Sequence, residues 1–188
     1  MALTPSTMTA LETPAPEFAL PDVVTGTTVS LGDFADRRAL LVMFICKHCP
    51  FVIHVRDELV RIGKDYAGKN VGIIAISSNN AAEYPDDSPE NLKAMALDCG
   101  FDFPLLYDET QAVAKAFGAA CTPDFFLYDR AGKLAYRGQL DDSRPRNGTP
   151  DGRDLRAALD ALLAGEPVSA LQKPSVGCNI KWKHGAHA

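Results

Sequence analysis

The chain has 188 residues, the length of one domain, which leaves no room for a second catalytic domain. Hydrophobic residues make up 46% of it and charged residues 23%, proportions that exclude a disordered or low-complexity chain. A net charge of −5 provides no basic footprint, so neither nucleic acid nor a membrane is expected as a partner, and the five cysteines are too sparse for a small disulfide-stapled module.

The start of the chain contains no basic segment followed by an apolar core of signal-peptide length. The longest apolar run, residues 39–46, is far shorter than the roughly 20 residues of a membrane span. We therefore expect a cytoplasmic protein, where neighbouring cysteines are catalytic or metal-binding more often than structural. The pattern divides the chain into a loose lead-in (residues 1–15), a folded domain (16–165) and a docked tail (166–188).

Strand-like and helix-like segments alternate from residue 39 onward. Residues 39–46 (ALLVMFIC) are continuously apolar, which is typical of a strand buried on both faces. Residues 71–77 (VGIIAIS) have the same character. Between them lies one apolar stripe at helical spacing, made of Phe51, Val55, Leu59, Ile62 and Tyr66. This order predicts a right-handed crossover between two parallel strands.

The second half of the chain predicts three more helices, a short strand and a hairpin. Ser88 and Pro89 are the cap and first turn of a helix that ends at Gly100, and residues 105–107 form a strand. Further elements are a helix capped by Asp108 and Gln111, a hairpin of residues 125–128 and 134–137, and a helix ending at Gly165. The order predicts an α/β protein whose central mixed sheet has helices on both faces.

The segment Cys46-Lys47-His48-Cys49-Pro50 lies at the junction between the first strand and the first helix. Unpaired amides and the dipole of a helix N-terminus favour a thiolate, and Lys47 and His48 add positive charge, so we expect the pKa of Cys46 to be lowered. A thiolate attacks disulfides, and Cys49 is one turn away and placed to resolve the mixed disulfide. The pattern indicates thiol-disulfide exchange at Cys46 and Cys49.

Other uses of this segment remain open. Two buried cysteines at a helix start can be purely structural, and Lys47 and His48 can be solvated charges. A zinc site would need four ligands, and the remaining candidates are in the tail, namely His184, His187 and Cys178. We predict neither a metal nor another cofactor.

Three segments resemble the thioredoxin superfamily, and within it the peroxiredoxin-like (redoxin) branch that carries a CxxC motif. They are residues 16–22 (PEFALPD), the cysteine segment at 46–50, and Thr122-Pro123. The resemblance implies a three-layer α/β/α thioredoxin-like fold with an N-terminal β-hairpin and an inserted α-β element. It also implies that Pro123 is a cis proline, whose loop packs against the cysteines and binds substrate through Thr122 and Pro123.

Departures from peroxiredoxins favour disulfide exchange over peroxide reduction. Peroxiredoxins have a threonine three residues before the peroxidatic cysteine and a proline four residues before that threonine. Counted back from Cys49, this chain has Cys46 and Val42 at those two positions. Pro123 takes the place of their activating arginine, so little is left to polarise a peroxide bond. Arg137 is a candidate substitute that we interpret as a surface charge. A thiol-dependent peroxidase is the second hypothesis, and a non-catalytic redox sensor or metal-binding adaptor is the third.

The remaining cysteines differ in their predicted roles. Cys99 falls on an apolar helix face and is predicted to be core. Cys121 and Cys178 are candidate additional thiols, with loop packing as the alternative for Cys121. Residues 174–183 around Cys178 resemble a tail motif of the same branch, and the alternative for them is docking through Ile180 and Trp182.

The expected substrates are a disulfide-containing protein, a small thiol or a peroxide, and the expected reductant is a thiol such as thioredoxin or glutathione. Asp86 and Asp87 are interpreted as solvated loop charges.

Overall fold

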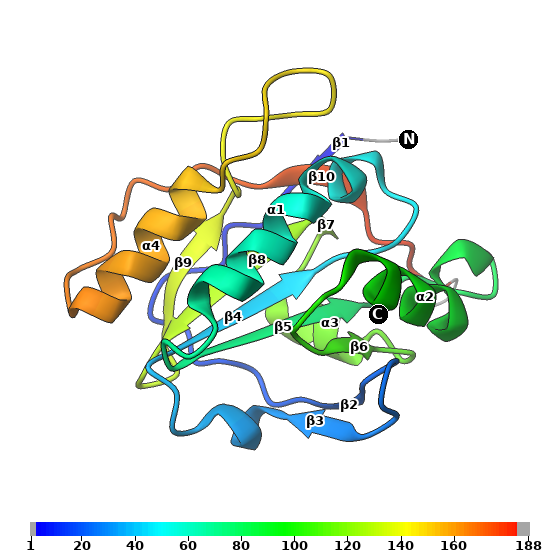
Figure 1. The fold of residues 1–188 in the computed structure, drawn as a ribbon, viewed down its shortest axis with the longest axis horizontal. Helices are drawn as coiled ribbons and strands as arrows, with labels where there is room; N and C mark the ends of the chain where they lie inside the picture. The colour runs from blue at the N-terminus through cyan, green and yellow to red at the C-terminus, as the bar shows by residue number, and fades with distance from the viewer. Residues whose placement is uncertain (1–2, 184–188) are drawn as a thin grey trace.

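The structure is a computed structural model that describes residues 3–183, and it has three layers with a mixed sheet in the middle (Figure 1). The strands of this sheet, in spatial order, are β6 (Leu105–Tyr107), β5 (Val71–Ser77), β4 (Ala39–Phe44), β8 (Asp124–Asp129) and β9 (Leu134–Gly138). The first three are parallel to one another, whereas β8 and β9 pair antiparallel. The predicted thioredoxin-like mixed sheet is confirmed.

Both faces of the sheet are covered, which explains why β4 is apolar at every position. Leu41 and Met43 face one core, and Val42 and Phe44 face the other. The first core is covered by α1 (Pro50–Tyr66), α2 (Pro89–Cys99) and α4 (Arg153–Ala164). The second is covered by α3 (Ala112–Phe117) and by the hairpin of β2 (Ala19–Pro21) and β3 (Thr28–Ser30). Two short 3-10 helices complete the elements, η1 (Leu31–Phe34) and η2 (Pro85–Asp87).

Local sequence features fix several element ends as predicted. Ser88 caps α2, because its hydroxyl oxygen accepts the Asn91 amide at 3.3 Å. Gly100 ends α2 with a φ of 68°, in the left-handed region that glycine favours.

The capping box expected at Asp108 and Gln111 is wrong. Helix α3 begins after Gln111, and the carboxylate of Asp108 accepts the amide of Ala114 at 2.9 Å. The Gln111 side chain points elsewhere and donates to the carbonyls of Ser78 and Lys181, at 2.6 and 2.8 Å. Gln111 therefore holds the tail rather than the helix start.

The chain ends are more ordered than the sequence suggests. The segment 3–5, which we expected to be a loose lead-in, forms β1 (Leu3–Pro5) and pairs with β10 (Val176–Asn179). Strand β10 also pairs with β7 (Cys121–Thr122), giving a second, three-stranded sheet beside the N-terminal end of α1 (Figure 1). The tail also docks through Ile180, which is buried, and Trp182, which is half-buried.

His184 and His187 are outside the described residues. The division at residues 15 and 165 remains a prediction. No helix within residues 3–183 has both the length and the apolar character that crossing a bilayer requires.

Candidate active site

The two cysteines of the motif lie where β4 gives way to α1. Cys49 is the N-cap residue of α1, and Pro50 occupies the first turn, where its missing amide hydrogen costs no hydrogen bond. Both cysteines are thiols in this structure, and their exposed fractions are only 1% for Cys46 and 0% for Cys49. The strand-to-helix junction predicted from the sequence therefore exists, but both sulfur atoms are enclosed.

Thr122, the last residue of β7, contacts both sulfur atoms. Its hydroxyl lies 3.3 Å from Cys46 Sγ, and its carbonyl oxygen lies 3.1 Å from Cys49 Sγ. The peptide bond from Thr122 to Pro123 is cis, as the resemblance implied. The loop packs against the cysteine pair as expected, with one residue facing both thiols.

A third thiol completes the cluster. Cys178 is the register partner of Thr122 in the β10–β7 pairing, and its Sγ lies 2.8 Å from Cys49 Sγ. Gly177 permits this approach, since a Cβ there would come within 2.0 Å of the Thr122 carbonyl oxygen. The sequence identified Cys178 as a candidate thiol but did not predict the strand that carries it.

Strand β10 also pairs with the segment that was expected to bind substrate through Thr122 and Pro123. Cys178 and Asn179 pair with Thr122 and Cys121, and the Ser175 hydroxyl donates to the Pro123 carbonyl at 2.6 Å. Pro123 itself is buried. In this state the edge of β7 is occupied by the chain's own tail.

Cys121 and Cys99 stand apart from this arrangement. Cys121 is buried, its Sγ lies 3.6 Å from the Pro123 carbonyl oxygen, and burial raises its pKa. Cys99 is half-buried on α2 and packs against the core, which is consistent with the predicted structural role.

Electrostatics place the negative charge on Cys49. The pKa of Cys49 is lowered to about 5, mainly by the hydrogen bond with Cys46. Burial alone would raise this pKa, and the hydrogen bonds with Cys178 and the Val52 amide add to the lowering. The bond between Cys46 and Cys49 raises the pKa of Cys46, as do burial and the negative charge of Asp87. The predicted lowering of the Cys46 pKa is wrong, because the hydrogen bond with Cys49, burial and the charge of Asp87 outweigh the effect expected from the helix N-terminus. Burial, followed by the bond to Cys49, raises the pKa of Cys178 to about 12.

Asp87, which we had interpreted as a solvated loop charge, is fully buried beneath the cysteine loop, so that prediction is wrong. Its carboxylate accepts the backbone amides of Lys47 at 2.7 Å and His48 at 3.4 Å. It also accepts the side-chain amide of Asn79 at 2.7 Å. Asp86 beside it is exposed, as expected. Asp87 thus fixes the conformation of the loop between the two cysteines.

The side chains of Lys47 and His48 are also engaged. Lys47 Nζ donates to Asn91 Oδ1 at 3.0 Å, and His48 Nδ1 lies 2.6 Å from Asp87 Oδ2. The His48 ring stacks on Tyr84 with its centroid 5.8 Å away. Their polar atoms contact Asn91 and Asp87 in preference to the two sulfur atoms.

One group of potential metal ligands occurs within residues 3–183, formed by Cys46, His48 and Asp87, whose ligand atoms lie within 4.8 Å of one another. The group has three members where structural zinc requires four. The carboxylate of Asp87 is already used by the loop amides and Asn79. These residues therefore do not make a complete structural zinc site.

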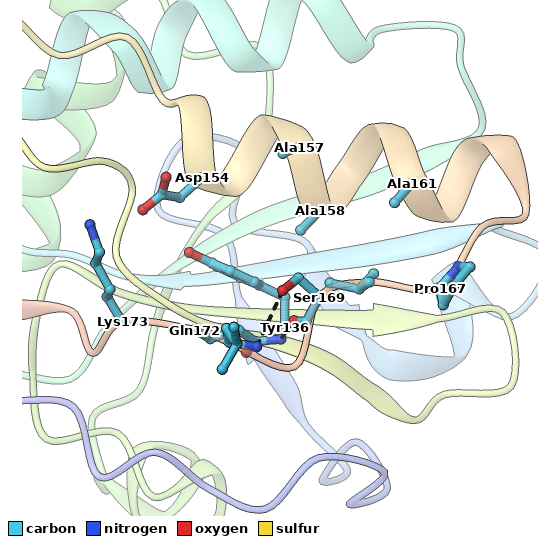
Figure 2. A pocket seen from close by; sticks show the side chains of 11 residues that line it. Tyr136, Asp154, Ala157, Ala158, Ala161, Pro167, Ser169, Gln172 and Lys173 are labelled. Atoms are coloured by element: carbon cyan, nitrogen blue, oxygen red, sulfur yellow. Dashed lines mark hydrogen bonds between the residues drawn. The ribbon is translucent and has the colours of Figure 1, made fainter.

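A separate cavity of about 380 Å³ lies between α4 and the segment 167–173 (Figure 2). Tyr136, Ala158 and Gln172 line it, and the Gln172 side chain donates to the Ser169 carbonyl at 2.8 Å. None of the lining residues is a cysteine or belongs to the loop at Thr122 and Pro123. This cavity is not part of the thiol cluster.

Comparison with known proteins gives a family and a set of structural relatives. Residues 10–159 match the Redoxin family model. An uncharacterized conserved protein from Geobacillus kaustophilus is 57% identical, with a TM-score of 0.96 and 99% of each chain covered. A hypothetical protein from Sinorhizobium meliloti is 50% identical, with a TM-score of 0.95, covering 97% of this chain and 100% of its own.

A more distant relative shares the fold alone. It is a thiol:disulfide interchange protein of the thioredoxin family from Chlorobium tepidum, which is 21% identical with a TM-score of 0.64, covering 82% of this chain and 98% of its own. A search of curated proteins found no match.

Proposed function

This chain belongs to the redoxin family of the thioredoxin-like superfamily, and we propose that it is a thiol-disulfide oxidoreductase that cycles Cys46 and Cys49 between a dithiol and a disulfide. The observation that carries the proposal is the contact of Thr122, next to the cis proline, with both sulfur atoms. The lowered pKa of Cys49 supplies a thiolate within the pair at neutral pH.

In the proposed reaction, Cys46 attacks the substrate disulfide while Cys49 takes its proton, since the two thiols share a hydrogen bond. The attack breaks the substrate S–S bond, forms a mixed disulfide and releases the first substrate sulfur as a thiolate. Cys49 then attacks Cys46 Sγ, its proton leaves with the second substrate sulfur, and the Cys46–Cys49 disulfide forms. A thiol reductant returns two electrons to the pair.

Peroxide reduction has less support. Within residues 3–183 no hydrogen bond joins Cys46 or Cys49 to an arginine, so a peroxide there would lack a cationic donor. Arg137, the candidate substitute, donates to the Thr9 carbonyl at 2.6 Å and to Gln172 Oε1 at 2.8 Å. The adaptor hypothesis is weakened in turn by the incomplete ligand set at Cys46, His48 and Asp87.

The partners remain proposals of the same kind. We propose a protein or small-molecule disulfide as substrate and a thiol such as thioredoxin or glutathione as reductant. The cytoplasmic location predicted from the sequence likewise remains a prediction.

A trapping experiment tests the assignment of the two roles. Cys49→Ser is expected to accumulate a mixed disulfide at Cys46 when mixed with oxidised glutathione at alkaline pH, where solvent base replaces Cys49 as the acceptor of the Cys46 proton, because the resolving thiol is gone. Cys46→Ser is expected to lose the catalysis of insulin-disulfide reduction by dithiothreitol. Cys99→Ser serves as the matched control outside the cluster. A rate of insulin reduction with Cys46→Ser equal to the wild-type rate would refute the proposal.

A further inference from the structure

Outside the Cys46–Cys49 pair, the tail strand β10 brings a third thiol, Cys178, into contact with Cys49. Their sulfur atoms are 2.8 Å apart, whereas a disulfide bond measures roughly 2.05 Å, so little movement would join them. Cys178 is only 3% exposed, so a disulfide from outside the chain has little access to its sulfur. Cys49 therefore has two thiol neighbours within the protein.

We infer that Cys178 is a third redox thiol and that the oxidised protein rests with a Cys49–Cys178 disulfide. The inference rests on the proposed function, because the Cys46–Cys49 disulfide supplies the oxidising equivalents.

Several contacts from the tail hold Cys178 at this place. On one side of it, the Ser175 hydroxyl donates to the Pro123 carbonyl at 2.6 Å, and the Ser175 carbonyl accepts the Ser6 amide at 2.8 Å. On the other side, the Lys181 amide donates to Asn79 Oδ1 at 2.8 Å. The position of Cys178 is thus fixed from both directions along the chain.

The close packing of Gly177 adds a separate requirement. A Cβ at this residue would lie 2.0 Å from the Thr122 carbonyl oxygen and 3.2 Å from the Pro123 nitrogen, both of them backbone atoms that cannot turn away. Any larger residue would push β10 off the Thr122 edge and carry Cys178 away from Cys49. The glycine next to Cys178 is what allows the two sulfur atoms to meet.

The transfer is a thiol-disulfide exchange with no net oxidation. Cys178 Sγ attacks Cys49 Sγ in the Cys46–Cys49 disulfide, a Cys49–Cys178 bond forms, and the Cys46–Cys49 bond breaks. Cys46 leaves with the bonding electron pair and takes up the proton that Cys178 gives away. The burial and negative surroundings that raise the pKa of Cys46 favour the protonated form that this step produces. The outcome is a restored Cys46 thiol and an oxidising equivalent stored at the tail strand.

Disulfide mapping of the full chain tests the inference. Reduced protein is oxidised with one equivalent of diamide, remaining thiols are alkylated with iodoacetamide, and disulfide-linked peptides are quantified by mass spectrometry. We expect the Cys49–Cys178 peptide to exceed the Cys46–Cys49 peptide at least fivefold in the wild type and in the Cys99→Ser control. A wild type that contains Cys46–Cys49 alone, with Cys178 fully alkylated, would overturn the inference.

Three variants separate this inference from the proposed function. Cys178→Ser is expected to form the Cys46–Cys49 disulfide, and its failure to do so would refute the proposed function instead. Cys46→Ser is expected to form Cys49–Cys178 directly, and absence of that bond refutes the third-thiol role. Gly177→Ala retains all the thiols, and its ratio of Cys49–Cys178 to Cys46–Cys49 is expected to fall at least fivefold, with an unchanged ratio contradicting the argument. Circular dichroism of each reduced variant establishes that it is folded before mapping.

Discussion

Replacing Asp87 by asparagine removes the charge beneath the cysteine loop while keeping the shape of the side chain. The remaining oxygen can still accept the amides of Lys47 and His48, which both bond to Oδ1. The new amide group replaces Oδ2, which accepts Asn79 Nδ2 at 2.7 Å and lies 2.6 Å from His48 Nδ1. Asn79 cannot turn over without loss, because its own Oδ1 accepts the Lys181 amide at 2.8 Å.

The expected loss of stability has two sources. The charged hydrogen bond between Asn79 Nδ2 and Asp87 Oδ2 is lost, and the N–H groups of Asn79 and of the new amide then face each other without an acceptor. Such a bond contributes about 1.5–3 kcal/mol, and a buried unsatisfied donor costs a similar amount. We expect Asp87→Asn to lower the free energy of unfolding by about 3 kcal/mol, measured by urea denaturation followed by circular dichroism. The exposed neighbour provides a matched control, with Asp86→Asn expected to stay within about 0.5 kcal/mol of the wild type. A loss below about 1 kcal/mol for Asp87→Asn, at an unchanged m value, would refute the assignment.

The same substitution has an electrostatic effect that a merely structural role would not produce. Because the negative charge of Asp87 raises the pKa of Cys46, its removal is expected to lower that pKa. The comparison is made between Cys49→Ser and the double variant Cys49→Ser/Asp87→Asn, in which Cys46 is the titrating thiol of the pair. The rate of Cys46 alkylation by iodoacetamide as a function of pH reports it, and an identical midpoint in both proteins would contradict this part of the reasoning.

Two further predictions concern pH. Absorbance of the reduced protein at 240 nm is expected to fall as the pH is lowered, with a midpoint near pH 5, because the Cys49 thiolate is protonated. Cys46→Ala is expected to raise that midpoint, because it removes the main hydrogen-bond donor to Cys49. An unchanged midpoint in this variant would contradict the role given to Cys46. Burial raises the pKa of Asp124 to about 6 from 3.8, so this carboxyl contributes stability that is complete below pH 3.8 and is lost as the pH rises through 6, in total about 3 kcal/mol. The free energy of unfolding is measured with urea at pH 3 and pH 7.5. Its fall between these pH values is expected to be smaller in Asp124→Asn than in the wild type by about 3 kcal/mol, and equal falls would count against the argument.

The elements that could be predicted from the sequence are those whose pattern is local and long. Strand β5 has the predicted bounds, Val71–Ser77, because a strand covered on both faces needs an unbroken apolar run. Helix α1 follows from an apolar stripe over four turns, and Gly100 ends α2 as predicted from its freedom in the left-handed region. The cis form of Pro123 came from the family resemblance, since an X-Pro bond is trans in most folded proteins.

The elements that could not be predicted depend on pairing between distant segments. Strands β1, β7 and β10 have two to four residues each, too few for alternation to be visible, and Leu3 pairs with Cys178 from the opposite end of the chain. Asp87 looks like a solvated acidic residue because the amides it accepts, at Lys47 and His48, lie about 40 positions earlier. The prediction for the pKa of Cys46 failed because the hydrogen bond with Cys49, burial and the distant charge of Asp87 all raise that pKa, and the local sequence does not reveal them.

The location of β10 links redox chemistry at the pair to the state of the tail. Cys46, Cys49 and Cys178 are each at most 3% exposed, so an external disulfide reaches them only when β10 or the cysteine loop moves. The loop is held by the buried carboxylate of Asp87, whereas β10 belongs to a small peripheral sheet whose other members have three and two residues. Segments with few backbone hydrogen bonds open at a lower free energy than the core of a sheet. We therefore expect that the three-stranded sheet opens before the central sheet does, and that release of β10 from Thr122 gives an external disulfide access to the thiols.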